Sequence, residues 1–302
     1  MTRLIFAIVC VVCVACSANA QDLARQRDEV IALGKLTASS EHIEIKPNQI
    51  KSPSAKPPMG ATAKDSWEKL VGRRSVKRPE FAYVDNDSAL PNVLIYGDSI
   101  SIHYTQRVRE KLNGKANIYR VYNNGMHSGA FLPKMKLMHD TMRDEQLVDP
   151  WAFDWDVIHF NVGLHDIKYL AGKTLDKENG TQVTSIESYQ KNLKEIVAYL
   201  DQLAPDAKLI FATTTPVPEG ANGRFAGDAQ KYNSAAMEVI LKSPHITIND
   251  LFTFTKPNLA KWSLKPNDVH YNPAGRTAQG DEVARVIIDE LQKGSCPRRC
   301  ND

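Results

Sequence analysis

The feature that most constrains the fold is the alternation of short apolar runs with helical patterns from Pro91 to about residue 292. The apolar runs are rich in β-branched residues and are followed by glycine or polar residues, as buried strands are. Between them, apolar residues recur every three or four positions, as Tyr104, Val108 and Leu112 do, which predicts helices. The predicted strands are 92–96, 117–122, 155–162, 208–213 and 245–248, and the predicted helices lie near 104–112, 189–203, 235–241 and 283–291. Because strands that alternate with helices form parallel sheets covered on both faces, we predict an α/β fold with a mostly parallel sheet.

The first strand is followed by a candidate nucleophile. In an open parallel sheet, ligands bind beyond the carboxyl ends of the strands. Here the strand ends in Gly97-Asp98-Ser99-Ile100, which places Ser99 just beyond a glycine and near the start of a helix. A serine in this position is either an exposed nucleophile or an ordinary helix cap, and for an isolated tripeptide the cap is the more frequent role.

Three later segments also place polar groups where strands end or loops precede helices. The second strand runs into residues 123–129, where Gly125 either offers an N–H to a developing oxyanion or forms a plain turn. The third strand leads to Gly163-Leu164-His165-Asp166. Near the end of the chain, Asp268 and His270 precede a helix that Pro273 can open, and a histidine beside an acid fits a base oriented by a carboxylate. Each signal alone has a structural explanation, but their conjunction on one rim favours catalysis.

Over about residues 91–292, these four segments resemble the sequence blocks of the SGNH hydrolases, also called GDSL esterases. The resemblance implies a flavodoxin-like, three-layer α/β/α fold in which Ser99 and His270 are catalytic partners. It also implies an oxyanion hole made by the N–H groups of Ser99 and Gly125 and a side chain of the third block. Such enzymes hydrolyse acyl esters of sugars, lipids or thiols without a metal or an organic cofactor, so the resemblance implies neither here.

Two positions depart from the family pattern. His165 stands where the third block normally has asparagine, so we expect the imidazole to supply the oxyanion N–H, with a pH dependence that an amide lacks. In the last block the aspartate normally lies three residues before the histidine, where this chain has Asn267. We expect Asp268 to orient His270. The alternatives are that Asn267 does so, or that Ser99 and His270 act as a dyad whose ring is held by main-chain carbonyls.

The residues outside the hydrolase domain indicate export. Residues 1–20 contain one basic residue, Arg3, then an apolar run over residues 4–15 and the sequence Ala18-Asn19-Ala20, which together predict a cleaved signal peptide. The protein is therefore expected to be secreted or periplasmic, with no integral membrane segment. Cleavage before Cys16 with lipid anchoring is the weaker alternative, because Cys13 occupies a position where a large aliphatic residue is expected.

Residues 21–90 are polar and interrupted by prolines, and we interpret them as an N-terminal extension; residues 293–302 form a C-terminal tail. The tail holds Cys296 and Cys300, which form a disulfide or remain free thiols. No second Cys/His pair has zinc-site spacing, so no metal is predicted.

The formal net charge of only +3 gives no indication of a nucleic-acid partner. We expect the partner to be a small-molecule or polysaccharide acyl ester, with O-acetyl groups on carbohydrate favoured. A lipid esterase or thioesterase is the alternative activity. A catalytically weak carbohydrate-binding protein on the same scaffold is the alternative of another class.

Overall fold

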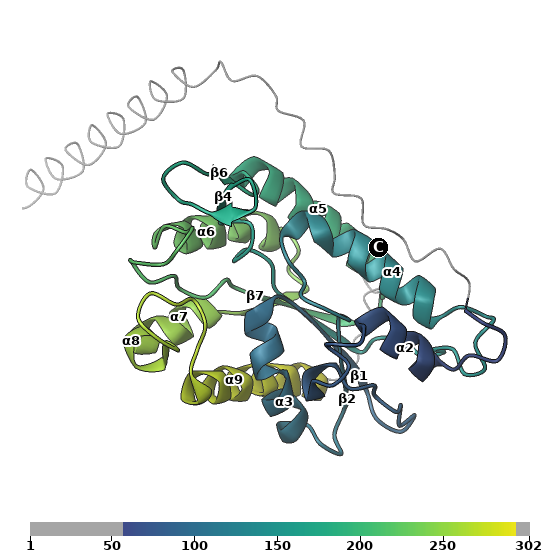
Figure 1. Cartoon of the computed structure of the whole chain (residues 1–302). Helices are drawn as coiled ribbons and strands as arrows, with labels where there is room; N and C mark the ends of the chain where they lie inside the picture. The colour runs from purple at the N-terminus through teal and green to yellow at the C-terminus, as the bar shows by residue number, and fades with distance from the viewer. Residues whose placement is uncertain (1–56, 294–302) are drawn as a thin grey trace, which may run out of the picture. The chain divides into compact units, whose positions relative to one another are not determined.

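The computed structural model describes residues 57–293 and is built around a five-stranded sheet (Figure 1). Its strands are β1 (Asn92–Tyr96), β2 (Asn117–Arg120), β3 (Val157–Phe160), β7 (Lys208–Ala212) and β8 (Ile246–Asn249). They lie in the order β2-β1-β3-β7-β8, and every neighbouring pair is parallel. Counted along the chain this is the order 2-1-3-4-5 of flavodoxin-like folds, so the predicted fold class is confirmed.

Helices cover both faces of this sheet. On one face, α3 and α9 pack against each other; on the other lie α4, α5 and α6 (Figure 1). Their bounds are α3 (Ser99–Lys111), α4 (Phe131–Met142), α5 (Ile186–Leu203), α6 (Asp228–Ile240) and α9 (Pro273–Gln292). Pro273 occupies the first turn of α9, where a missing N–H costs nothing.

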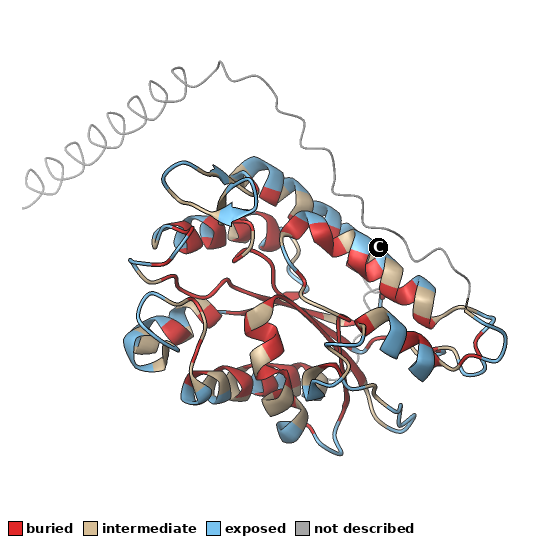
Figure 2. Cartoon of the chain, viewed as in Figure 1, coloured by how far each residue is buried: buried red, intermediate tan, exposed pale blue. Residues whose placement is uncertain are grey.

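Most residues of these five strands are buried and are coloured red in Figure 2. All five residues of β1 are buried, and Val93 and Leu94 lie opposite Val157 and Ile158 of β3. Because helices exclude water from both faces, these strands need no alternation of apolar and polar residues. Each fully buried aliphatic side chain contributes about 1.5–3 kcal/mol of transfer free energy to this core.

Part of the predicted N-terminal extension is folded. Helix α2 (Ala63–Val71) begins with a capping box in which Thr62 and Asp65 bind each other's backbone N–H groups. The helix packs on α4, and its buried Trp67 donates a hydrogen bond from Nε1 to the Phe81 carbonyl at 2.8 Å. Neither α2 nor α4 was predicted from the sequence. The predicted signal peptide, residues 21–56 of the extension, and Cys16, Cys296 and Cys300 lie outside the described residues.

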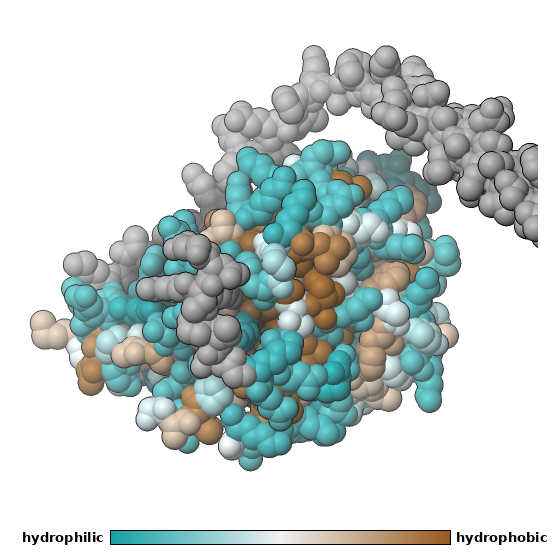
Figure 3. Space-filling model, turned by 180° about the vertical axis from the view of Figure 1, so that it is seen from behind, coloured by the Kyte–Doolittle hydropathy of each residue, from teal (hydrophilic) through white to brown (hydrophobic). Residues whose placement is uncertain are grey.

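A small antiparallel sheet follows the third parallel strand. Its strands β4 (Tyr169–Ala171), β5 (Thr174–Leu175) and β6 (Thr181–Gln182) lie in the order β5-β4-β6. The remaining short elements are η1 (Pro79–Phe81), η2 (Ser128–Ala130), α7 (Leu251–Thr255), η3 (Lys256–Asn258) and α8 (Leu259–Trp262). Much of the face in Figure 3 is hydrophilic, with hydrophobic residues gathered near its middle. None of the helices within residues 57–293 is long and apolar enough to cross a membrane.

Candidate active site

Ser99 begins helix α3 directly after the central strand β1, as the sequence predicted. Asp98 makes the connection, and its carboxylate caps the helix by accepting a hydrogen bond from the Ile100 N–H at 2.9 Å. The capping group is therefore Asp98, which leaves the Ser99 hydroxyl available for other contacts. Ser99 is half-buried, at the carboxyl end of the sheet and the N-terminal end of a helix.

Ser99, His270 and Asp268 form a continuous hydrogen-bonded line. The Ser99 Oγ lies 2.9 Å from His270 Nε2, and His270 Nδ1 lies 2.8 Å from Asp268 Oδ1. Since a carboxylate only accepts hydrogen bonds, Nδ1 carries the proton of the neutral ring and Nε2 accepts from the serine hydroxyl. The same Asp268 oxygen accepts the His270 backbone N–H at 3.0 Å, which fixes the carboxylate relative to the ring.

The structure separates the alternatives for the partner of His270. Burial by itself raises the pKa of Asp268, but the hydrogen bonds from His270 and the nearby charges of that ring and Lys265 outweigh it. The pKa of Asp268 therefore lies below its ordinary value of 3.8, and the group is ionised at neutral pH. Asn267 is exposed, adopts a positive φ of 65° and places its side chain beside Gly220. Asp268 is thus the side chain in contact with the ring.

Gly125 does not offer a free donor in this structure. Its N–H donates to the Gly97 carbonyl at 2.9 Å, and its own carbonyl accepts the Tyr96 hydroxyl at 2.8 Å. A Cβ on Gly125 would lie 2.8 Å from both the Gly97 oxygen and the Tyr96 ring, which explains the need for glycine. The role that the resemblance implied for Gly125 is therefore not supported by the hydrogen bonding, because its N–H already has an acceptor.

The loop that follows Gly125 is held by Asp166 of the third block. The buried Asp166 carboxylate accepts the Ser128 N–H at 3.0 Å and the Ser128 hydroxyl at 2.6 Å. Asn192 donates to the same hydroxyl at 2.8 Å. Burial raises the pKa of Asp166 to about 6, although the hydrogen bonds from Ser128 oppose the rise. In the described chain, the N–H groups of His127 and Gly129 meet no acceptor, and Gly129 is the more exposed of these two residues.

His165 is held by a neighbouring lysine. Lys168 Nζ lies 2.9 Å from His165 Nδ1. Burial lowers the pKa of His165 to about 3, and the neighbouring basic groups Lys168, Arg224, His127 and His270 act in the same direction. The ring is therefore neutral throughout the range in which an esterase works. The pH dependence that we predicted from titration of His165 itself falls outside that range.

Arg224 adds a second cation that the sequence analysis missed. Its Nε donates to the carbonyl of Leu164, the residue before His165, at 2.8 Å. Burial lowers the pKa of Arg224 to about 10, while the carboxylates of Asp98 and Asp268 oppose the decrease. Arg224 comes 60 residues after Leu164, in a loop without a recognisable motif, so no local signal in the sequence could have found it.

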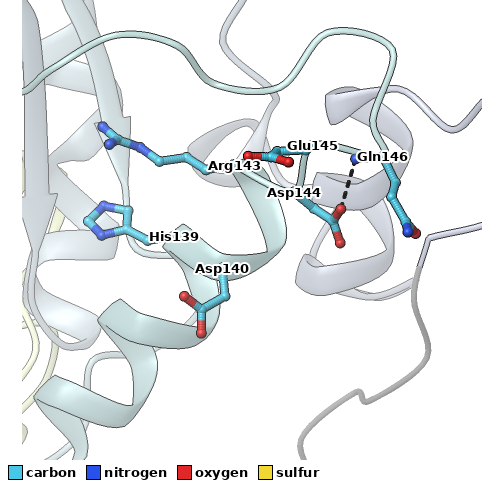
Figure 4. Close-up of a pocket in the computed structure, with 6 residues that line it drawn as sticks. All are labelled: His139, Asp140, Arg143, Asp144, Glu145 and Gln146. Atoms are coloured by element: carbon cyan, nitrogen blue, oxygen red, sulfur yellow. Dashed lines mark hydrogen bonds between the residues drawn. The ribbon is translucent and has the colours of Figure 1, made fainter.

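A cavity of about 510 Å³ lies elsewhere, along the end of α4 and the loop after it (Figure 4). It is lined by His139, Asp140, Arg143, Asp144, Glu145 and Gln146. The buried His139 ring stacks on Trp155 and accepts its indole N–H at 3.1 Å, a structural role. No group of three or more His, Cys, Asp or Glu residues within the described part of the chain could hold a metal ion.

Comparisons with family models and with solved structures both point to the same protein family. The model of the GDSL-like lipase/acylhydrolase family matches residues 95–278, more than half of the chain. An acetyl xylan esterase structure aligns with a TM-score of 0.50 at 16% identity, covering 65% of this chain and 99% of that one. A lipase/acylhydrolase from Enterococcus faecalis aligns with a TM-score of 0.48 at 15% identity, covering 65% and 95%. A search of curated protein sequences gave no match.

Proposed function

From the premise that the chain belongs to the GDSL-like lipase/acylhydrolase family, and is therefore a serine ester hydrolase, we propose that it cleaves small O-acyl esters through an acyl-enzyme on Ser99. The observation that carries this proposal is the line of hydrogen bonds from Ser99 through His270 to Asp268. A hydroxyl, a general base and an orienting carboxylate in this order are what nucleophilic acyl transfer requires.

Each member of the line has one part in the proposed reaction. His270 Nε2 takes the proton of the Ser99 hydroxyl as the oxygen attacks the ester carbonyl, and Asp268 stabilises the imidazolium that forms. His270 then gives the proton to the departing alcohol, which leaves the acyl group on Ser99. Water, deprotonated by His270, attacks the acyl-enzyme and releases the acid.

The tetrahedral oxyanion needs donors placed before the reaction begins. The Ser99 N–H lies in the first turn of α3, where backbone N–H groups have no partner within the helix. We assign His165 Nε2 as the second donor, and Gly129 in place of Gly125 as the donor of the second loop. The reason for this change is that the Gly125 N–H is bound to Gly97, whereas the Gly129 N–H is free within the described residues.

The charged surroundings of the site support a hydrated substrate over a long-chain lipid. Lys168 and Arg224 lie close enough to lower the pKa of His165. Placing a long acyl chain against such groups would remove them from water without compensation, which costs free energy. We therefore propose an O-acetyl ester of a carbohydrate as the substrate. An acetyl xylan esterase with the same fold is consistent with this choice but does not establish it.

We also propose that the enzyme is exported, on the strength of residues 1–20 alone. Intact-mass measurement of the protein recovered from the secreted or periplasmic fraction tests this directly. A chain that starts at Gln21 is the expected result. Full-length protein retained in the cytoplasm would contradict export, and a lipidated chain that starts at Cys16 would establish the anchored alternative.

The decisive experiment on function replaces Ser99 by alanine. With an aryl acetate, Ser99→Ala should lower kcat by up to about 10⁶-fold, as loss of a nucleophile does in a serine hydrolase, and should abolish labelling by a fluorophosphonate. Ser101→Ala is a control because this buried serine points to the Asp98 carbonyl. It should still be labelled. Equal activity of the wild type and Ser99→Ala would remove Ser99 from the mechanism.

The substrate class needs a separate measurement. Acetyl esters should exceed octanoyl esters in kcat/KM, and acetate should be released from an acetylated polysaccharide such as acetyl xylan. A steady rise of kcat/KM with chain length would favour the lipid-esterase alternative. Binding of the polysaccharide without acetate release or fluorophosphonate labelling would favour a carbohydrate-binding protein.

A further inference from the structure

The contact between Lys168 and His165 determines which ring nitrogen carries the proton. A lysine ammonium has three donors and no acceptor, so in the 2.9 Å contact the His165 Nδ1 must accept. A neutral imidazole has one proton, which then resides on Nε2. Without a partner at Nδ1, either nitrogen can carry that proton. The lysine therefore selects the ring form in which Nε2 is a donor.

Among the described residues, the groups that shift the pKa of His165 most are all basic side chains. They are Lys168, Arg224, His127 and His270, and each of them disfavours a protonated His165 ring. Lys168 itself is half-buried. Burial and the charge of Arg224 lower its pKa to about 8, and the carboxylate of Asp98 partly offsets this.

We propose that Lys168 is a positioning residue that holds His165 in the Nε2–H form, so that the imidazole donates to the oxyanion as an amide would. The inference rests on the proposed function, which gives His165 its part in acyl transfer. Lys168 touches neither the serine nor the ester in this mechanism. It acts through His165, from the start of the small antiparallel sheet.

A defined pH dependence follows from this arrangement. Below about pH 8 the Lys168 amine is charged, and Nδ1 must accept from it. Above that pH the neutral amine has a lone pair and can accept a hydrogen bond from Nδ1–H, so the Nε2–H form is no longer enforced. The value of kcat for an aryl acetate should therefore decline as the pH rises through about 8.

A double-mutant cycle tests the coupling between the two side chains. Lys168→Met should lower kcat about tenfold or more, bounded by the ~10²–10³-fold cost of removing an oxyanion donor, while KM changes little. In the His165→Asn background, where the amide N–H has no alternative form, adding Lys168→Met should have no further effect. An equal loss in both backgrounds, or no loss in the first, would overturn the proposal.

Two variants serve as controls. Lys173→Met removes an exposed lysine from the turn between β4 and β5, and it should leave kcat unchanged. Lys168→Arg keeps a permanent charge and donor, so it should retain kcat below pH 8 and lose the alkaline decline. Retention of the decline in Lys168→Arg would show that another group causes it, and would overturn the pH argument.

The ring form is also measured without any activity. Nitrogen-15 NMR of the full-length protein labelled at histidine should show an unprotonated Nδ1 and a protonated Nε2 for His165 at pH 7. Lys168→Met should shift that signal toward a mixture. This result would stand even if Ser99→Ala left activity intact, so failure of the proposed function and failure of this inference are distinguishable. An unchanged His165 signal in Lys168→Met would refute the inference.

Discussion

Replacing Asp268 by asparagine tests how the base is supported. The substitution keeps the shape of the side chain and an oxygen that can accept a hydrogen bond, but it removes the negative charge 2.8 Å from His270 Nδ1. In the proposed mechanism that charge matters when the ring becomes an imidazolium. We therefore expect Asp268→Asn to lower kcat, with a smaller effect on KM.

The geometry sets the size of the effect. Two unit charges 2.8 Å apart interact by about 6 kcal/mol at an effective dielectric constant of about 20, and by about 1.5 kcal/mol in water. The imidazole is 33% exposed and the carboxylate 14%, so the true value lies between these limits. At about 1.4 kcal/mol per tenfold change in rate, the expected loss in kcat is about 10- to 10⁴-fold. The upper end equals the loss seen for the corresponding change in the serine-protease triad.

The assay is steady-state hydrolysis of an aryl acetate at pH 7, with unfolding by urea as the check that each variant is folded. Asn267→Gly is the matched control, because glycine tolerates the positive φ of 65° that alanine would strain. It should keep kcat within about threefold, since the Asn267 side chain lies beside Gly220 and the hydrogen bond to His270 Nδ1 comes from Asp268. If Asp268→Asn keeps most of its activity, the charge is not needed, and a dyad of Ser99 and His270 is the better description.

Two further predictions concern the loops that frame the site. Burial raises the pKa of Asp166 from 3.8 to about 6, so the folded protein binds a proton at this carboxyl more tightly than the unfolded chain does. The contribution of this carboxyl to stability therefore decreases as the pH rises from about 4 to 6. Asp166→Asn should remove up to about 3 kcal/mol of that pH dependence, so it should lower the free energy of unfolding in urea more at pH 4 than at pH 6. An equal decrease at both pH values would contradict the raised pKa of Asp166. Gly125→Ala should lower the free energy of unfolding by about 1–3 kcal/mol, because the new methyl group meets the Gly97 carbonyl and the Tyr96 ring. A Gly125→Ala variant as stable as the wild type in urea would mean that this close approach is not required.

The sheet and the position of Ser99 at the start of a helix were predictable because their signals are local. Strand β1 is a run of five buried residues, and the glycine and aspartate after it fix where Ser99 enters the helix. The carboxylate next to His270 is two residues away, so spacing alone nominated it. In a parallel sheet such local signals converge in space, because all the carboxyl ends lie on one rim.

Helix α2 was missed although its signal is also local. Thr62 and Asp65 have the spacing of a capping box, but the helix is short and lies in a segment dominated by prolines and polar residues. Its stability comes largely from packing, since Trp67 is buried against partners far along the chain, including Trp151. Periodicity in one short segment does not report such contacts.

The groups that tune the site could not be predicted, because their partners are distant in sequence. Asp166 holds Ser128 from 38 residues away. Arg224 reaches the Leu164 carbonyl across 60 residues. Such pairings depend on how the loops are folded together, and an isolated charged residue gives no indication of its partner.

His165 and Lys168 show why a departure from a family pattern should be considered together with its neighbours. An asparagine amide at this position always presents an N–H, whereas an imidazole presents one at Nε2 only if the proton is kept off Nδ1. Considered alone, the histidine predicted a pH dependence of its own, but burial and adjacent cations place its pKa at about 3. The group that titrates within the working range is the lysine, whose pKa is about 8. His165 and Lys168 are thus best understood together. The charged lysine keeps the N–H of the imidazole at Nε2, whereas an asparagine amide has its N–H by covalent structure.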